Sequence, residues 1–274
     1  MIEKAIYRNH LGEEFRFGEN GVYMNAGGLR DYTWKIEQKN NRISKFEKGI
    51  VSRPLNVVIM AHTEADGIAI RNRLFEIVEK DVLAMKAGHL IVGDHKLECF
   101  VTGSTKSKYL MTERYMLVKL TIQTDNPNWI MENSYSFYSD ATTTGYEYLD
   151  YNFDFPIDYL SANNPRLLRN SGFTETNFKL IIYGYCENPS VTIGSHTYQV
   201  NCTVQDDEKL VIDSVKKTVV LIDRNRKETN VFNKRNRNSY IFKKIPAGEV
   251  GISFDGTFDF DVIIKEERSE PKWT

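Results

Sequence analysis

Residues 257–265 read TFDFDVIIK, and the pattern of these nine residues indicates the fold class. Apolar and polar side chains alternate with a period of two, which is typical of a half-buried antiparallel strand. We expect the polar side chains of Thr257, Asp259 and Asp261 to face water. Four apolar side chains share the other face of the strand: Phe258, Phe260, Val262 and Ile264.

The same alternation recurs elsewhere in the chain, between residues that favour tight turns. Met116, Val118, Leu120 and Ile122 alternate in one segment, and Phe178, Leu180 and Ile182 alternate in another. Pairs containing glycine supply the positive φ that hairpin turns require. The chain is therefore predicted to consist mostly of antiparallel hairpins. Four such pairs stand between alternating segments: Asn20-Gly21, Gly93-Asp94, Gly194-Ser195 and Asp255-Gly256.

One segment, from about residue 64 to residue 87, follows helical spacing instead. Thr63 is placed to cap the first turn, with Asp66 three residues on as a shortened capping box. Gly88 suits a left-handed stop after the last turn. We predict an amphipathic helix whose apolar stripe covers a sheet. The stripe comprises Ile70, Leu74, Ile77 and Val78, with Val82 as a further candidate.

The length of 274 residues favours two domains, because single cores usually stop growing below this size. Regular alternation ends in a polar and aromatic stretch between Pro127 and Pro156. We predict an N-terminal domain over residues 1–135, a linker over 136–155 and a C-terminal domain over 156–274. Residues 266–274 are candidates to return to the N-terminal domain. The predicted fold class is mainly β, with one helix in the N-terminal domain.

Composition argues against several classes of partner. Lys and Arg number 36 and Asp and Glu number 37, so the chain has almost no net charge. Strong electrostatic attraction to nucleic acid or anionic lipid is therefore not expected. No segment approaches the roughly 20 apolar residues that cross a bilayer. The first residues do not form a signal peptide, so we expect a soluble protein made in the cytoplasm. Cys99, Cys186 and Cys202 lack zinc-ligand spacing and are predicted to be buried thiols.

No reactive constellation is visible in the sequence. Phosphate-binding glycine loops, the nucleophile elbow and the zinc-protease motif are all missing. Of the five scattered histidines, only His89 and His95 are placed to approach each other, across the Gly93-Asp94 turn. Two ligands do not complete a zinc site, so we favour two solvent-facing strand residues. The sequence predicts no catalytic residue, no cofactor and no metal site.

Three surface features keep alternatives open. The acidic groups Asp206-Asp207-Glu208 and Asp255, Asp259 and Asp261 are more typical of solvated surface than of a glycosidase pair, which we rank last. The basic run 224–237 is interpreted as a mobile loop between strands. Exposed tyrosines are candidate contacts for a glycan or a protein partner, and they make a carbohydrate-binding module the second hypothesis. These tyrosines are Tyr146, Tyr148 and Tyr151.

Several segments, in their order and spacing, resemble the distal tail (Dit) protein family of siphophages and phage-derived particles. In the N-terminal half these are IYRNHLGEEFRF, RPLNVVIMAH, KAGHLIVGDHKLECFVTG and MLVKLTIQTDNPNWI. In the C-terminal half they are FDFPIDY, RNSGFTETNFKLIIYGYCENPSVTIGSHTYQV, KLVIDSVKKTVVLI and FDFDVIIKEERSEPKW. Pro127 and Trp129 match the turn at the end of the family's ring domain, and Pro271 and Trp273 match its C-terminal signature.

The resemblance implies a non-enzymatic protein of the virion tail tip. It implies an N-terminal β-sandwich domain that forms a ring of six copies, singly or as two rings back to back, around a channel. It also implies a C-terminal β-sandwich that resembles galectins or carbohydrate modules. The implied partners are the major tail protein of the tail tube, a tail-associated lysin or fibre hub protein, and receptor-binding or baseplate proteins.

Overall fold

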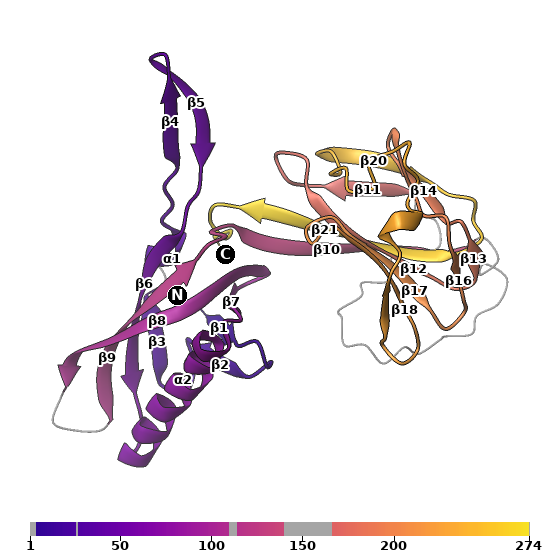
Figure 1. The fold of residues 1–274 in the computed structure, drawn as a ribbon. Helices are drawn as coiled ribbons and strands as arrows, with labels where there is room; N and C mark the ends of the chain where they lie inside the picture. Colours follow the sequence, from indigo (N-terminus) through magenta and orange to yellow (C-terminus); the bar gives the residue numbers. More distant parts are fainter. Residues whose placement is uncertain (1–3, 26, 110–113, 140–165, 274) are drawn as a thin grey trace. The chain divides into compact units, whose positions relative to one another are not determined.

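The computed structural model describes residues 4–25, 27–109, 114–139 and 166–273. The chain divides into two compact units, and both are mainly antiparallel β as predicted (Figure 1). Unit 1 comprises Met1–Met131 and Glu267–Thr274, and unit 2 comprises Glu132–Glu266. Strands β10 (Trp129–Phe137) and β21 (Asp259–Arg268) contribute residues to both units. Residues 136 and 137, predicted to begin a linker, are the last two residues of β10.

Unit 1 contains two runs of antiparallel strands that share the long strand β8. One run has the order β2–β1–β7–β8 and the other has the order β8–β9–β6–β3. The first part of β8 pairs with β7, and its remainder, from Phe100 onward, pairs with β9. The strand bounds are β1 (Ala5–Arg8), β2 (Glu14–Phe17), β3 (Val22–Asn25), β6 (Val51–Met60), β7 (Gly88–Val92), β8 (His95–Tyr109) and β9 (Tyr115–Thr124).

Helix α2 (Glu64–Ala84) packs against the strands of unit 1, as the apolar stripe predicted (Figure 1). The predicted capping box is present: the Thr63 side chain accepts from the Asp66 N–H, and the Asp66 carboxylate accepts from the Thr63 N–H. The buried face of α2 includes Leu74, Ile77 and Val78. Burying one such side chain contributes about 1.5–3 kcal/mol, so this face holds the helix on the sheet.

The predicted end of α2 is wrong by three residues. The helix ends at Ala84, and Met85 takes the left-handed conformation with φ 52°. Gly88 is instead the first residue of β7, where a Cβ atom would lie 2.2 Å from the Asp81 carboxylate. Close approach to that buried carboxylate, and not a left-handed stop, requires glycine at this position. Val82 is exposed and does not belong to the buried stripe.

Unit 2 is a sandwich of two antiparallel sheets. Within this unit the first sheet has the order β19–β18–β17–β12–β21–β10 and the second has the order β11–β20–β14–β15. Strands β13 (Cys186–Glu187) and β16 (Thr203–Val204) form a short separate pair. The other bounds are β11 (Leu167–Asn170), β12 (Asn177–Tyr183), β14 (Ser190–Ile193), β15 (His196–Gln199), β17 (Lys209–Asp213), β18 (Thr218–Ile222), β19 (Glu228–Asn230) and β20 (Gly248–Ser253).

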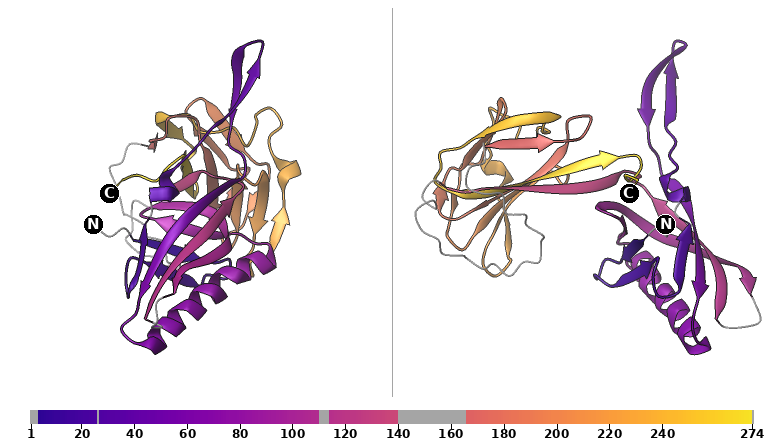
Figure 2. Two further views of the ribbon diagram at one scale, coloured as in Figure 1. Left: turned by 90° about the vertical axis from the view of Figure 1, so that its left-hand side faces the viewer. Right: turned by 180° about the vertical axis from the view of Figure 1, so that it is seen from behind.

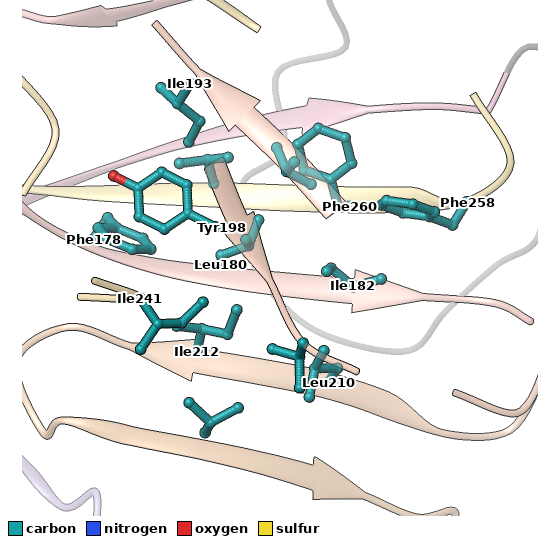
Figure 3. Packing of buried hydrophobic residues seen from close by; sticks show 14 of the residues in the cluster. Phe178, Leu180, Ile182, Ile193, Tyr198, Leu210, Ile212, Ile241, Phe258 and Phe260 are labelled. Carbon is teal, nitrogen blue, oxygen red and sulfur yellow. The ribbon is translucent and has the colours of Figure 1, made fainter. Parts of the chain in front are cut away.

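The core of unit 2 lies between the two sheets (Figure 3). Phe178 of β12 and Tyr198 of β15 lie side by side, with ring centroids 4.9 Å apart. Leu180 and Ile182 of β12 and Ile193 of β14 belong to the same buried cluster. Four of the five apolar residues of the segment 257–265 are buried in this core, as their alternation predicted, and the fifth, Ile263, is half-buried on the opposite face. Asp259 and Asp261 are only half-buried, and Asp261 accepts hydrogen bonds from Ser136 and Tyr183. The alternation of apolar and polar residues therefore predicted correctly which face of β21 points into the core.

Three of the four predicted hairpin turns are present, and the fourth has another role. Asn20-Gly21, Gly93-Asp94 and Gly194-Ser195 each join adjacent paired residues. Asp255-Gly256 connects β20 to β21, which belong to different sheets of the sandwich. The pair favours a tight turn, as in a hairpin, but the two strands that it joins pair with other strands and not with each other.

The basic run 224–237 is not the mobile loop that its charge suggested. Strand β19 lies within it and pairs with β18, and Val231 is buried in the core of unit 2. The 3-10 helix η2 (Phe232–Lys234) follows, and the Arg235 guanidinium lies 3.8 Å from the Phe232 ring centroid. One buried valine and one cation–π contact order this segment despite its charge. A second short helix, α1 (Gly27–Arg30) in unit 1, was not predicted either.

Candidate functional site

Strands β4 (Lys35–Lys39) and β5 (Arg42–Glu47) form a two-stranded sheet of their own in unit 1. Their turn is the pair Asn40-Asn41, with φ of 52° and 58°, which is the conformation of a tight two-residue hairpin turn. The hairpin stands away from the rest of unit 1 in every view (Figures 1 and 2). Every residue of β4 and all but the last residue of β5 are exposed.

The two faces of this hairpin differ in chemistry. Ile36 pairs with Phe46 and Gln38 pairs with Ile43, so these side chains share one face. The Trp34 ring meets the Phe46 ring edge-on at 6.4 Å and extends the same face. We name Trp34, Ile36, Ile43 and Phe46 the apolar hairpin face. The opposite face carries charges: Lys35, Glu37, Lys39, Arg42, Lys45 and Glu47.

The apolar hairpin face lies open to solvent. Its four large side chains are between 43% and 55% exposed. A hairpin without a third strand or a packed face is only marginally stable in water. A contiguous group of exposed apolar side chains with a charged reverse face is typical of a protein interaction surface. This hairpin is therefore the candidate functional site of unit 1.

The base of the hairpin is fixed by residues of the same unit. The Lys48 ammonium lies 4.4 Å from the centroid of the Trp34 ring. It also donates hydrogen bonds to the side chains of Asn128 and Ser269, at 2.5 and 2.8 Å. Burial lowers the pKa of Lys48, and the nearby Arg53 acts in the same direction. The hairpin thus projects from a fixed base, which favours a defined orientation for binding.

Two of the four residues matched to the family lie in unit 1, where β9 leads into β10. Trp129 is fully buried in the core of unit 1, and its indole N–H has no hydrogen-bond partner among the described residues. The Pro127 carbonyl accepts a long hydrogen bond, 3.4 Å, from the buried Arg53, which also donates to the Leu29 carbonyl at 2.8 Å. The side chain of Arg53 thus links this turn to helix α1.

The other two matched residues lie in the C-terminal segment of unit 1. Pro271 is buried, whereas Trp273 is 73% exposed. The Arg30 guanidinium lies 4.0 Å from the Trp273 ring centroid and donates to the Lys272 carbonyl. The structure brings neither pair into a reactive arrangement with a titratable group. Pro127, Trp129 and Pro271 are buried, and Trp273 has a cation–π contact, so each of the four residues fits a packing role.

The histidine pair of the sequence prediction does not converge. His89 pairs with Glu98, and His95 pairs with Val92, so alternation places the two rings on opposite faces of the sheet. The prediction that both face solvent is wrong for His95, which is 4% exposed on the core side beside Leu97. Across the described ranges, no group of three metal-ligating side chains is present.

The other candidates from the sequence have simpler roles. Asp206 and Asp255 accept hydrogen bonds from the backbone N–H groups of Tyr185 and Thr257. The three cysteines are buried free thiols, as predicted. None of the described helices is long and apolar enough to cross a membrane. Tyr146, Tyr148 and Tyr151 lie outside the described residues, so the carbohydrate-binding hypothesis remains a prediction.

Sequence reasoning also missed a buried polar cluster in unit 1. The Asp81 carboxylate is fully buried and accepts from the Tyr7 hydroxyl at 2.6 Å. Its other oxygen accepts from the His10 backbone N–H at 2.9 Å and lies 2.6 Å from His10 Nδ1. Burial, together with Asp81, raises the pKa of Tyr7. The cluster joins α2 to β1, and an acid at the C-terminal end of an otherwise apolar helical face was the signal for it.

The class of molecule is thus a mainly antiparallel β-protein with a helix-covered first unit, a sandwich as second unit and no reactive cluster in the described ranges. Its fold is shared along nearly its whole length with the Dit protein of phage SPP1, described as a paradigm of the hub adsorption apparatus in phages that infect Gram-positive bacteria. The TM-score is 0.61 at 10% identity, covering 98% of this chain and 100% of that one.

Chains of the phage P2 baseplate in its activated conformation are similar to the same extent. The baseplate solved with Ca matches with a TM-score of 0.59 at 13% identity, covering 99% of this chain and 100% of that one. The baseplate solved with Sr matches with the same TM-score at 12% identity and the same coverage. No family model and no curated protein matches the sequence. The predicted resemblance to the Dit family is thus confirmed for the fold.

Proposed function

We propose that this chain is a non-enzymatic structural component of a phage tail, located at the tail tip of the virion and made in the host cytoplasm. The observation that carries the proposal is the coverage of the fold match, which extends over 98% of this chain and all of the SPP1 Dit chain. A match to one unit alone would fit many unrelated sandwich proteins. A match to both units in the same order is far more restrictive.

In finer detail, we propose that six copies form a ring, singly or as two rings back to back, with unit 1 as the ring-forming part. The ring joins the tail tube, built from the major tail protein, to a tail-associated lysin or fibre hub protein and to receptor-binding or baseplate proteins. The exposed apolar hairpin face supports self-association, because a monomer gains nothing from leaving it open. Chains commonly bury such surfaces by assembling into closed symmetric rings.

Light scattering coupled to size exclusion tests the ring directly. We expect the purified full chain, at high concentration, to elute as a species of six subunits or of twelve. The share of this species should rise with concentration, because association follows mass action. A mass of 31.8 kDa at every concentration, which is that of the single chain, would contradict the ring.

A further inference from the structure

Helix α2 carries a second row of apolar side chains outside the face that packs on the sheet. Ile68, Phe75 and Val82 follow one another at intervals of seven residues, and Asn72 and Glu79 lie between them at helical spacing. All three apolar side chains are exposed, Phe75 to 58%. A helix on the surface of a monomer needs only one apolar stripe. The core of unit 1 does not account for this outer row of α2.

The outer row of α2 and the apolar hairpin face cannot meet within one chain. The hairpin β4–β5 and helix α2 lie at opposite ends of unit 1 in all three views (Figures 1 and 2). The base of the hairpin is held by Lys48, so the hairpin does not fold back across the unit. Any contact between the two surfaces therefore joins two copies of the chain.

The charges around the two surfaces are complementary. The hairpin itself, residues 35–47, contains four basic and two acidic residues. Apart from the buried Asp81, helix α2 contains four acidic and three basic residues, and Glu64 and Glu79 lie along its outer row. Complementary charges at the rim of an apolar contact favour the correct partner and the correct register. A second copy of this chain offers both the apolar and the electrostatic match.

We propose that the apolar hairpin face of one copy docks on the outer row of α2 of the next copy. This inference rests on the proposed ring function and names the surfaces that build the ring. The two surfaces differ, so the contact is heterologous: each copy uses its hairpin on one side and its helix on the other. Repetition of such a contact closes a ring when the rotation between copies suits it.

Disulfide trapping between full-length chains tests this contact. Chains carrying Phe46→Cys are mixed with chains carrying Phe75→Cys under mild oxidation, and the products are separated without reductant. A second pair, Ile36→Cys with Ile68→Cys, guards against an unfavourable geometry at one position. The native thiols are buried, so we expect them to form no disulfide between chains. The unsubstituted chain, oxidised in the same way, serves as the control for this. Phe173→Cys, exposed on unit 2, replaces the helix variant as the matched control.

We expect dimers in at least one hairpin-helix mixture, and few in either variant alone or in the mixture with Phe173→Cys. Phe75→Ser should also weaken self-association by at least about tenfold, as expected for a central aromatic contact, whereas Phe173→Ser should not.

The outcomes separate the two proposals. If the unsubstituted chain forms rings but neither pair is trapped, the docking contact is wrong and the ring function stands. Trapping of Phe46→Cys alone, as efficient as in the mixture, means that hairpins meet hairpins, which overturns the inference in the same way. If the unsubstituted chain stays monomeric and no mixture is trapped, both proposals fail.

Discussion

At the residue scale, the buried carboxylate of Asp81 determines its neighbours. A Cβ atom on Gly88 would lie 2.2 Å from Asp81 Oδ2 and 2.7 Å from the Tyr7 hydroxyl. Neither group can withdraw, because both are buried and bonded to each other. We therefore expect Gly88→Ala to lower the free energy of unfolding by about 3 kcal/mol, measured by urea denaturation.

Gly251→Ala provides the matched control for this prediction. Gly251 lies in strand β20, and an added Cβ meets nothing within 4 Å. The control should change the unfolding free energy by less than about 1 kcal/mol. Equal effects of the two substitutions would show that lost backbone freedom, and not the Asp81 cluster, determines the cost at residue 88.

A second residue-scale prediction concerns pH. Burial raises the pKa of the Cys99 thiol from 9.0 to about 12. Between these values the unfolded chain loses a proton that the folded chain keeps, so the stabilising contribution is present below pH 9 and is lost as the pH rises toward 12. Cys99→Ala should reduce the alkaline slope of the unfolding free energy by on the order of 1 kcal/mol per pH unit. An unchanged slope between pH 9 and 11 would contradict the burial of this thiol.

At the element scale, the sequence predicted α2 but not the hairpin β4–β5. The capping box at Thr63 and the 3.6-residue period made the helix recognisable, whereas its end was misplaced because Met85, and not glycine, adopts the left-handed conformation. In the hairpin, a bulge at Ser44 places Ile43 and Phe46 on one face although they are three residues apart. A search for strict alternation misses this pattern, and the turn Asn40-Asn41 lacks the glycine that marks most hairpins.

The hairpin supports an element-scale prediction that separates folding from assembly. Replacing residues 36–46 with Asn-Gly keeps the pairing of Lys35 with Glu47 across a two-residue turn and removes the apolar hairpin face except Trp34. The removed residues are exposed, so the midpoint of thermal unfolding of the monomer should stay within a few degrees. Self-association, measured by light scattering, should be lost.

Two results would count against that separation. A large drop in the unfolding midpoint would mean that the hairpin stabilises unit 1 and is not mainly an assembly surface. Unchanged self-association would mean that other surfaces of the chain form the contact. The variant Glu37→Lys, on the charged face, is a suitable control because it alters charge and leaves the apolar hairpin face intact.

At the scale of the whole molecule, the alternating segments predicted a mainly β chain, and the order of its motifs predicted the fold of the Dit proteins. The pairing of β21 with β12 joins residues about 80 positions apart, and no local pattern specifies such a partner. The same limit applies to the assembly surface. Trp34, Ile36 and Phe46 have ordinary core chemistry, and only the folded chain reveals that they are exposed.

Negative-stain imaging of the purified full chain shows whether the protein forms the proposed ring. We expect particles with sixfold symmetry and a central hole for the unsubstituted chain, and none for the variant that lacks residues 36–46. Fields of single particles without a hole, at concentrations where light scattering also shows the mass of one chain, would contradict the ring.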